Sequence, residues 1–126
     1  MSQIRFINTD LEVEVRRPPQ ALVAVLEAHG VFALHEPAPG PGGVLSIYFE
    51  AMVEGDAQTT VDAILDAIEA LTGEAREIWD TSARRTLDLG FDAGASSHAV
   101  SEDLSAASVA RAAAAGLSLR ITLYAP

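Results

Sequence analysis

Two sets of residues in this chain have types and spacings that could support chemistry. The first set combines one imidazole with three carboxylates at even positions of two neighbouring strand-like segments, so it could bind a divalent metal or perform acid–base work. Its members are Asp88, Asp92, His98 and Glu102. They share one sheet face if residue 92 pairs with 98 and residue 88 with 102. If instead Phe91 pairs with Val100, the aspartates lie apart from the other two groups on an ordinary polar face.

The second set is acidic and lies on a predicted helix. Its members are spaced four and three residues apart and therefore project together: they are Asp62, Asp66 and Glu69. This face is either a solvated surface or a docking surface for a cationic partner. The predicted partner-binding site also includes Trp79 and Asp80, because an exposed indole beside acids could anchor an interface; the alternative for Trp79 is a place in the core. Carboxylates on a helix without a glycine-bearing loop do not make a calcium-loop pattern.

Charge limits the partners of this chain. Its 126 residues have a formal net charge of −10 at pH 7, and the segment from Glu50 to Asp80 holds nine of the 18 acidic residues but only one base, Arg76. This imbalance disfavours nucleic acid and anionic membranes and permits a basic protein partner. The absence of cysteine excludes disulfides, thiolate nucleophiles and cysteine-based zinc sites.

Motifs for catalysis or cofactor binding are missing from the sequence. The glycine-rich segment 40–43 lacks the Lys-Ser/Thr of a phosphate-binding loop, and no nucleophile elbow or H-E-x-x-H motif occurs. We therefore predict no cofactor and no catalytic residue, and we favour a binding protein over an enzyme. No apolar run approaches the roughly 18 residues that span a bilayer, and no signal-peptide pattern begins the chain, so we expect a cytoplasmic protein.

The N-terminal half should supply strands and one helix. Residues 4–15 alternate as a strand, but the inward positions change parity across residues 8–10, which predicts a bulge or turn there. Two prolines then open a helix that ends at Gly30. Segments 31–35 and 44–54 should form a hairpin whose wide loop is too rich in proline and glycine to continue either strand. Because segment 44–54 carries apolar side chains at both parities, we predict that it is the central strand.

The C-terminal half alternates between helices and strands. The patterns predict, in order, a helix at 61–71, a second helical piece at 74–84, a strand at 87–92, a further strand at 98–103, a helix capped by Ser105 that ends at Gly116, and a strand with one wet face at 117–124. The element order favours an α+β fold, a mixed α/β sandwich with five or six strands and two or three helices packed on the sheet. We expect residues 1–126 to form a single domain.

The C-terminal third resembles a family of uncharacterised bacterial domains of unknown function. The resemblance is carried by LDLGFDAG, LSAASVARAAAAG and LSLRITLYAP, in which a D-x-G strand is followed by a capped helix and a terminal strand ending in Tyr-x-Pro. The matching residues are Asp88, Gly90, Tyr124 and Pro126. The resemblance implies an α/β fold and carries no established activity.

Three functions remain open from the sequence. The first is a small acidic cytoplasmic protein-binding domain that engages a basic partner, as an immunity or inhibitor protein engages a cationic toxin. The second is a small-ligand binder or enzyme with a pocket near the loop 36–43, close to His35 and Tyr48. The third is a structural homodimer. The first requires that arginines do not cover the acidic helix face after folding; the arginines that could do so are Arg16, Arg17, Arg84, Arg85 and Arg111.

Overall fold

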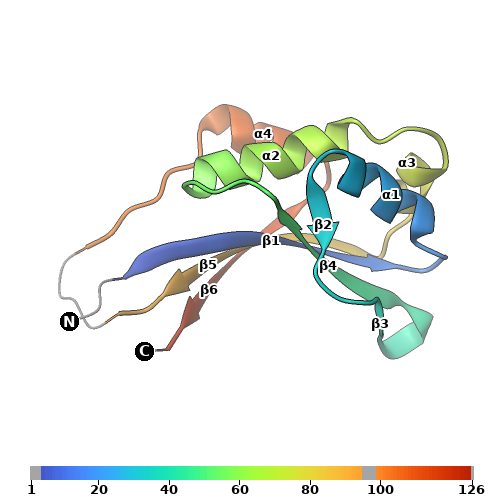
Figure 1. The fold of residues 1–126 in the computed structure, drawn as a ribbon, viewed down its shortest axis with the longest axis horizontal. Helices are drawn as coiled ribbons and strands as arrows, with labels where there is room; N and C mark the ends of the chain where they lie inside the picture. The colour runs from blue at the N-terminus through green and yellow to red at the C-terminus, as the bar shows by residue number, and fades with distance from the viewer. Residues whose placement is uncertain (1–3, 95–98, 126) are drawn as a thin grey trace.

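The computed structural model describes residues 4–94 and 99–125 as one six-stranded sheet with four α-helices on one of its faces (Figure 1). The strands are β1 (Arg5–Val15), β2 (Val31–Ala33), β3 (Ala38–Pro39), β4 (Leu45–Ala51), β5 (Arg84–Asp92) and β6 (Ser118–Tyr124). The helices are α1 (Gln20–Ala28), α2 (Ala57–Glu69), α3 (Gly73–Asp80) and α4 (Ala106–Ala114), and a 3-10 turn spans Pro41–Gly43. The structure confirms the predicted α+β class.

The strand order is β2-β4-β1-β5-β6, with β3 paired to β4. Strand β1 is antiparallel to both β4 and β5, whereas β5 and β6 are parallel and are joined through α4. The prediction of a central strand at 44–54 is therefore wrong, because β1 is central. Apolar residues at both parities of β4 did not mean burial on both faces: Tyr48 is 38 % exposed on the face that the helices leave uncovered, which we call the open face.

A β-bulge in β1 sorts side chains between the two faces of the sheet. The register with β5 shifts between Phe6 and Asn8, which confirms the predicted irregularity close to its expected place. Before the shift, Phe6 meets Phe91 edge-on at 5.6 Å between ring centroids, on the helix side. After it, odd positions such as Leu11 face the helices, and even positions such as Asp10 face the open side.

The predicted hairpin is confirmed by the antiparallel pairing of β2 with β4. Its loop also contains β3, a separate two-residue strand that pairs with Ser46 and Leu45 and that the sequence pattern did not predict. Proline is tolerated in β3 because this strand lies at the edge of the sheet. The helix at 20–28 ends as predicted at Gly30, whose positive φ of 80° suits a residue without a side chain.

The predicted strand at 98–103 is absent from the described residues 99–105. The parallel β5–β6 pair explains this difference, since a parallel connection must leave the sheet and cross its face, here through α4. Glu102 marks the path, because its Oε1 accepts a hydrogen bond of 2.8 Å from the backbone nitrogen of Ala57 at the start of α2. This contact holds the connecting segment against the helix layer.

One hydrophobic core fills the space between sheet and helices. Its largest fully buried side chains come from both layers and include Leu11, Phe49, Leu87, Leu22, Ile64 and Trp79. The helix layer does not reach the β6 edge, where the apolar side chains that should pack inward remain exposed. The expectation of one wet face on the last strand is therefore wrong, as β6 has two. Within the described part of the chain, no helix is long and apolar enough to cross a membrane.

Candidate functional site

The three carboxylates of the acidic face of α2 are partly compensated by one arginine of α4. The guanidinium of Arg111 lies 2.7 Å from Asp66 Oδ1, 2.8 Å from Glu69 and 3.5 Å from Asp62. Asp62 also accepts hydrogen bonds from Ser108 Oγ at 2.6 Å and from Gln58 Nε2 at 2.8 Å. The expectation of uncompensated carboxylates on this helix is therefore wrong. Because Arg111 already contacts all three carboxylates, this face is weakened as a docking site for a cationic partner.

Trp79 and Asp80 do not form an exposed anchor either. The Trp79 side chain is fully buried, and its Nε1 donates a hydrogen bond of 3.1 Å to the carbonyl of Ala115. Asp80 forms an ion pair of 3.3 Å with Arg76 one turn earlier in α3. The assignment of Trp79 to a partner surface is wrong, because its indole fills the core beneath α4.

The predicted metal-binding set is dispersed by the fold. Asp88 and Asp92 lie on the open face, but Asp92 is paired with Arg5 at 2.8 Å, and Glu102 caps α2 in the helix layer. His98 lies outside the described residues. Among residues 4–94 and 99–125, no group of three histidines or carboxylates could hold a metal ion. The expectation that Glu102 shares a sheet face with Asp88 is wrong, since the segment that carries Glu102 is not a strand.

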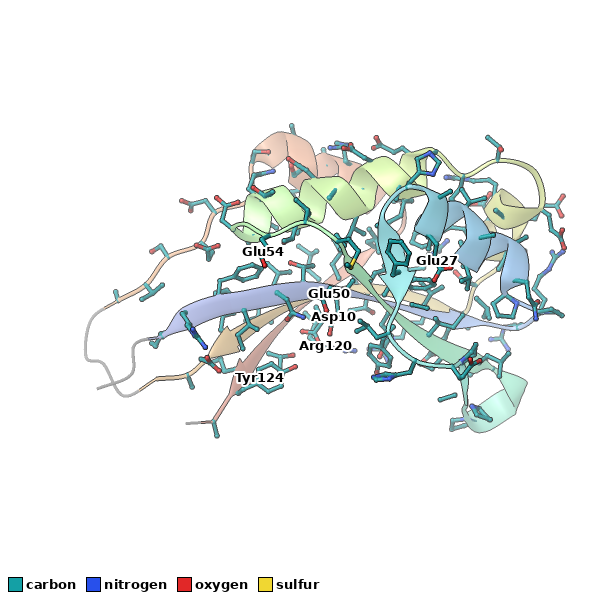
Figure 2. The ribbon with its side chains drawn as sticks, viewed as in Figure 1. Asp10, Glu27, Glu50, Glu54, Arg120 and Tyr124 are labelled. Atoms are coloured by element: carbon teal, nitrogen blue, oxygen red, sulfur yellow. The ribbon has the colours of Figure 1, made fainter. Side chains whose placement is uncertain are left out.

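The strand register assembles a different carboxylate group, which sequence patterns did not reveal. On the open face, Asp10 of β1 stands directly opposite Glu50 of β4 on one side and Asp88 of β5 on the other. We call these three residues the acidic row. Figure 2 labels Asp10 and Glu50, which lie beneath the helix layer in that view. Like charges at directly opposed strand positions repel, so the row costs stability when it is fully ionised.

An asparagine and a glycine shape the row. Asn8 Nδ2 donates to Asp10 Oδ1 at 3.0 Å and lies 3.4 Å from Glu50 Oε2, so one amide bridges two acids. Asn8 lies over Gly90, where an added Cβ would come within 3.1 Å of Asn8 Oδ1 and 3.2 Å of Tyr124 Cε2. Gly90 therefore provides the space in which the Asn8 and Tyr124 side chains approach the sheet.

The pKa of Asp10 is raised from 3.8 to about 6. Burial is the largest cause, followed by the charges of Glu50 and then Asp88. No arginine lies within ion-pair distance of Asp10 in the described part of the chain. Its carboxyl group therefore gains or loses a proton close to neutral pH. In the ionised state this half-buried carboxylate attracts a cation more strongly than a carboxylate in water does.

Arg120 compensates only one end of the row. Its guanidinium lies 3.6 Å from Asp88 Oδ2 and 3.5 Å from Glu12 Oε1, and Thr122 Oγ1 donates to Asp88 Oδ1 at 2.6 Å. A hydrogen bond to Glu12 is the main cause of the raised pKa of the Tyr48 phenol. Asp88 and Glu12 are thus paired with neighbours, whereas among residues 4–94 and 99–125 the side chains of Asp10 and Glu50 are hydrogen-bonded only by the Asn8 amide.

A buried hydroxyl on the same face has no hydrogen-bond partner. The Thr86 side chain, next to Glu12 in the strand register, is 1 % exposed, and its Oγ1 makes no hydrogen bond within the described residues. An unpaired buried hydroxyl costs free energy. The open face therefore has a second local cost of folding beside the repulsion within the acidic row.

A separate hollow lies near the loop 36–43, where the sequence suggested a pocket. Its volume is about 440 Å³, and its polar lining residues are His35, Glu36 and Glu27 of α1, the last labelled in Figure 2. Tyr48 does not line it. The hollow carries one imidazole and two carboxylates over an otherwise apolar floor that includes Ile47.

The acidic row was missed because its members are 38 or more residues apart in sequence. The usable signal was the alternation of Asp10 with Leu11 after the predicted bulge, which puts the aspartate opposite to the core. That pattern assigns a face to one residue but does not pair strands. Comparison of the chain with protein-family models, with curated proteins and with solved structures finds no match, so its site is interpreted from its own residues alone.

Proposed function

We propose that this chain is a small acidic protein-binding domain of the cytoplasm, of the immunity or inhibitor kind, which engages a basic partner through its open sheet face. The observation that carries the proposal is the placement of Asp10 between Glu50 and Asp88, with no ion pair to an arginine in the part of the chain that the structure describes. A lysine or arginine of a partner would donate hydrogen bonds to the carboxylates of Asp10 and Glu50. It would thereby relieve a repulsion that the free protein retains.

The stability cost of the open face supports a functional reading. Repulsion within the acidic row and the unpaired Thr86 hydroxyl both oppose folding, and such costs persist in proteins where they serve recognition. On α2, by contrast, Arg111 gathers the acids into a compensated group. All three acids of α2 thus contact an arginine, whereas in the acidic row only Asp88 does among the described residues.

Apolar side chains lie beside the acidic row on the same face. Phe32 of β2 stands opposite Glu50, and the backbone nitrogen of Leu34 bonds to the carbonyl of Tyr48 at 2.9 Å. Phe32 and Leu34 are each 41 % exposed, and Tyr48 is 38 % exposed. Aromatic and aliphatic groups next to charge are typical of protein interfaces, where they add contact area to electrostatic steering.

Titration with a synthetic peptide of alternating arginine and leucine, followed by backbone amide NMR shifts, tests this proposal. We expect saturable shifts in β1, β4 and β5, and affinity that falls with salt. The double variant Asp10→Asn/Glu50→Gln should weaken binding on the order of tenfold, equivalent to about 1.4 kcal/mol. Affinity should also increase from pH 5 to pH 7 as Asp10 ionises.

The matched control removes the same charge from exposed acids outside the sheet, with Glu74→Gln and Asp103→Asn together. This variant should retain most of the affinity. Equal weakening by the two double variants would mean that the peptide responds only to the net charge of −10, and the sheet site would be rejected.

The hollow beside His35 favours a second candidate function, the binding of a small molecule. An imidazole and two carboxylates in one hollow suit a ligand with cationic or hydrogen-bond-donating groups, and the volume of about 440 Å³ is in the range of small-molecule sites. Ligand-observed NMR with a library of small amines would test it. Binders that are lost in Glu27→Gln but kept in Asp10→Asn would support this site, and a library without binders would dismiss it.

A further inference from the structure

The two edges of the sheet are built differently. The β2 edge is three residues long and is followed along β4 by the two-residue β3, which contains Pro39. Short strands and proline are devices that prevent unwanted pairing at an edge. Strand β6 at the other edge has seven residues without glycine or proline, and no described strand pairs with its outer side.

The side chains of β6 also leave this edge unprotected. Leu119, Ile121 and Leu123 are 48 %, 69 % and 63 % exposed on the helix side of the sheet. The one charged residue of the strand, Arg120, lies on the open face and is directed to Glu12 and Asp88. Charge therefore opposes the approach of a second β6 only in a register that sets Arg120 opposite its own copy.

We infer that β6 pairs in antiparallel fashion with β6 of a second copy of this chain, about a twofold axis at Ile121. This register places Ile121 opposite Ile121, Leu119 opposite Leu123 and Arg120 opposite Thr122, and all seven residues of the strand pair. The six apolar side chains then lie together on the helix side of the joined sheet.

Charge and the number of paired residues select this register among those in which opposed side chains lie on the same face of the joined sheet. An axis at Arg120 would set two guanidinium groups directly opposite each other, which is destabilising. An axis at Thr122 would pair a shorter part of the strand. A second copy is therefore complementary to this edge in both polarity and charge, and the contact is isologous, as in most homodimers.

The inferred dimer would join two sheets into one, with both open faces on the same side. Two acidic rows would then face one partner surface. The inference does not depend on the proposed function, because the edge of β6 and the acidic row involve different groups. Since each copy carries a charge of −10, salt should favour the dimer by screening their repulsion.

Register-specific cross-linking gives a direct test because the chain contains no cysteine. Opposed residues of an antiparallel pair have Cα atoms about 4.5–5.5 Å apart, within the range that a disulfide spans. Ile121→Cys alone should therefore form a disulfide-linked dimer on mild oxidation. Leu119→Cys alone should not, since its copies would lie about 14 Å apart along the strands. A mixture of Leu119→Cys and Leu123→Cys should cross-link.

Sedimentation velocity of the unmodified chain over a concentration series supplies the second measurement. We expect a dimer that dissociates in Ile121→Lys and persists in Met52→Lys, a matched change at a residue that is 74 % exposed elsewhere. Circular dichroism checks that each variant is folded. If a lysine variant does not fold, the cross-linking of the cysteine variants tests the dimer instead. A monomeric unmodified chain at millimolar concentration would overturn the inference, as would equal cross-linking of Leu119→Cys and Ile121→Cys.

Discussion

Asp10 is the residue at which stability and the proposed partner recognition conflict. Its pKa is raised from 3.8 to about 6, so the folded protein holds a proton between these pH values that the unfolded chain has lost. The contribution of this group to stability is therefore complete below pH 4 and is lost as the pH rises through 6. We predict that Asp10→Asn increases the free energy of unfolding at pH 7.5 by about 1 kcal/mol and changes it little at pH 4. The value is smaller than the pKa shift alone would give, because solvent screens a partly exposed carboxylate.

Urea unfolding at the two pH values measures this difference. The control is Glu54→Gln, which removes one negative charge from an exposed position outside the row and should change stability little at either pH. An Asp10→Asn variant that is less stable than the parent at pH 7.5 would show that the carboxylate is compensated in the folded protein. The same result would weaken the proposed binding site.

At the scale of elements, the α2–α4 contact depends on Arg111. Its hydrogen bond is the main reason that the pKa of Glu69 is lowered, so this pair stabilises the fold above the ordinary pKa of 4.5 and the effect is lost as the pH falls further. We predict that Arg111→Gln lowers the free energy of unfolding at pH 7 by about 1 kcal/mol, with the deficit shrinking in acid. It should also create a second region of peptide-induced NMR shifts on α2.

Denaturant unfolding and the same peptide titration measure the two effects. Arg16→Gln is the matched control, because Arg16 is exposed and makes no ion pair within the described residues. If Arg111→Gln and Arg16→Gln had equal effects, the arginine would act only through net charge. The compensation of α2 would then have no specific structural role.

At the scale of the whole molecule, we expect the net charge of −10 to make stability and the proposed binding of a basic partner respond to salt in opposite directions. Screening reduces repulsion within the folded chain but weakens attraction to a basic partner. We predict that a change from low to moderate NaCl raises the melting temperature by roughly 3 °C, which corresponds to about 1 kcal/mol. The affinity for the arginine–leucine peptide should fall over the same range. Calorimetry and the titration together check this, and a melting temperature that falls with salt would contradict it.

Local patterns predicted most of the elements. The apolar stripe of α2, the alternation of β5 and the cap at Ser105 all depend on neighbours within a few residues, and the Ser105 hydroxyl accepts from the Ser108 nitrogen at 3.1 Å as expected. The β1 bulge was predictable for the same reason, since a change of parity is visible in the chain itself. The α+β class follows from the order of these elements.

The sequence by itself determined most of the helices and strands and that the chain is strongly acidic. Only the tertiary structure decided which acids are neutralised, because Arg111 reaches Asp66 from 45 residues away and strand pairing sets Asp10 beside Glu50 from 40 residues away. It also decided that β1 is central and that β6 is left at an open edge. Local periodicity assigns a side chain to a face, but charge compensation and strand order depend on contacts between distant segments, which no short pattern encodes.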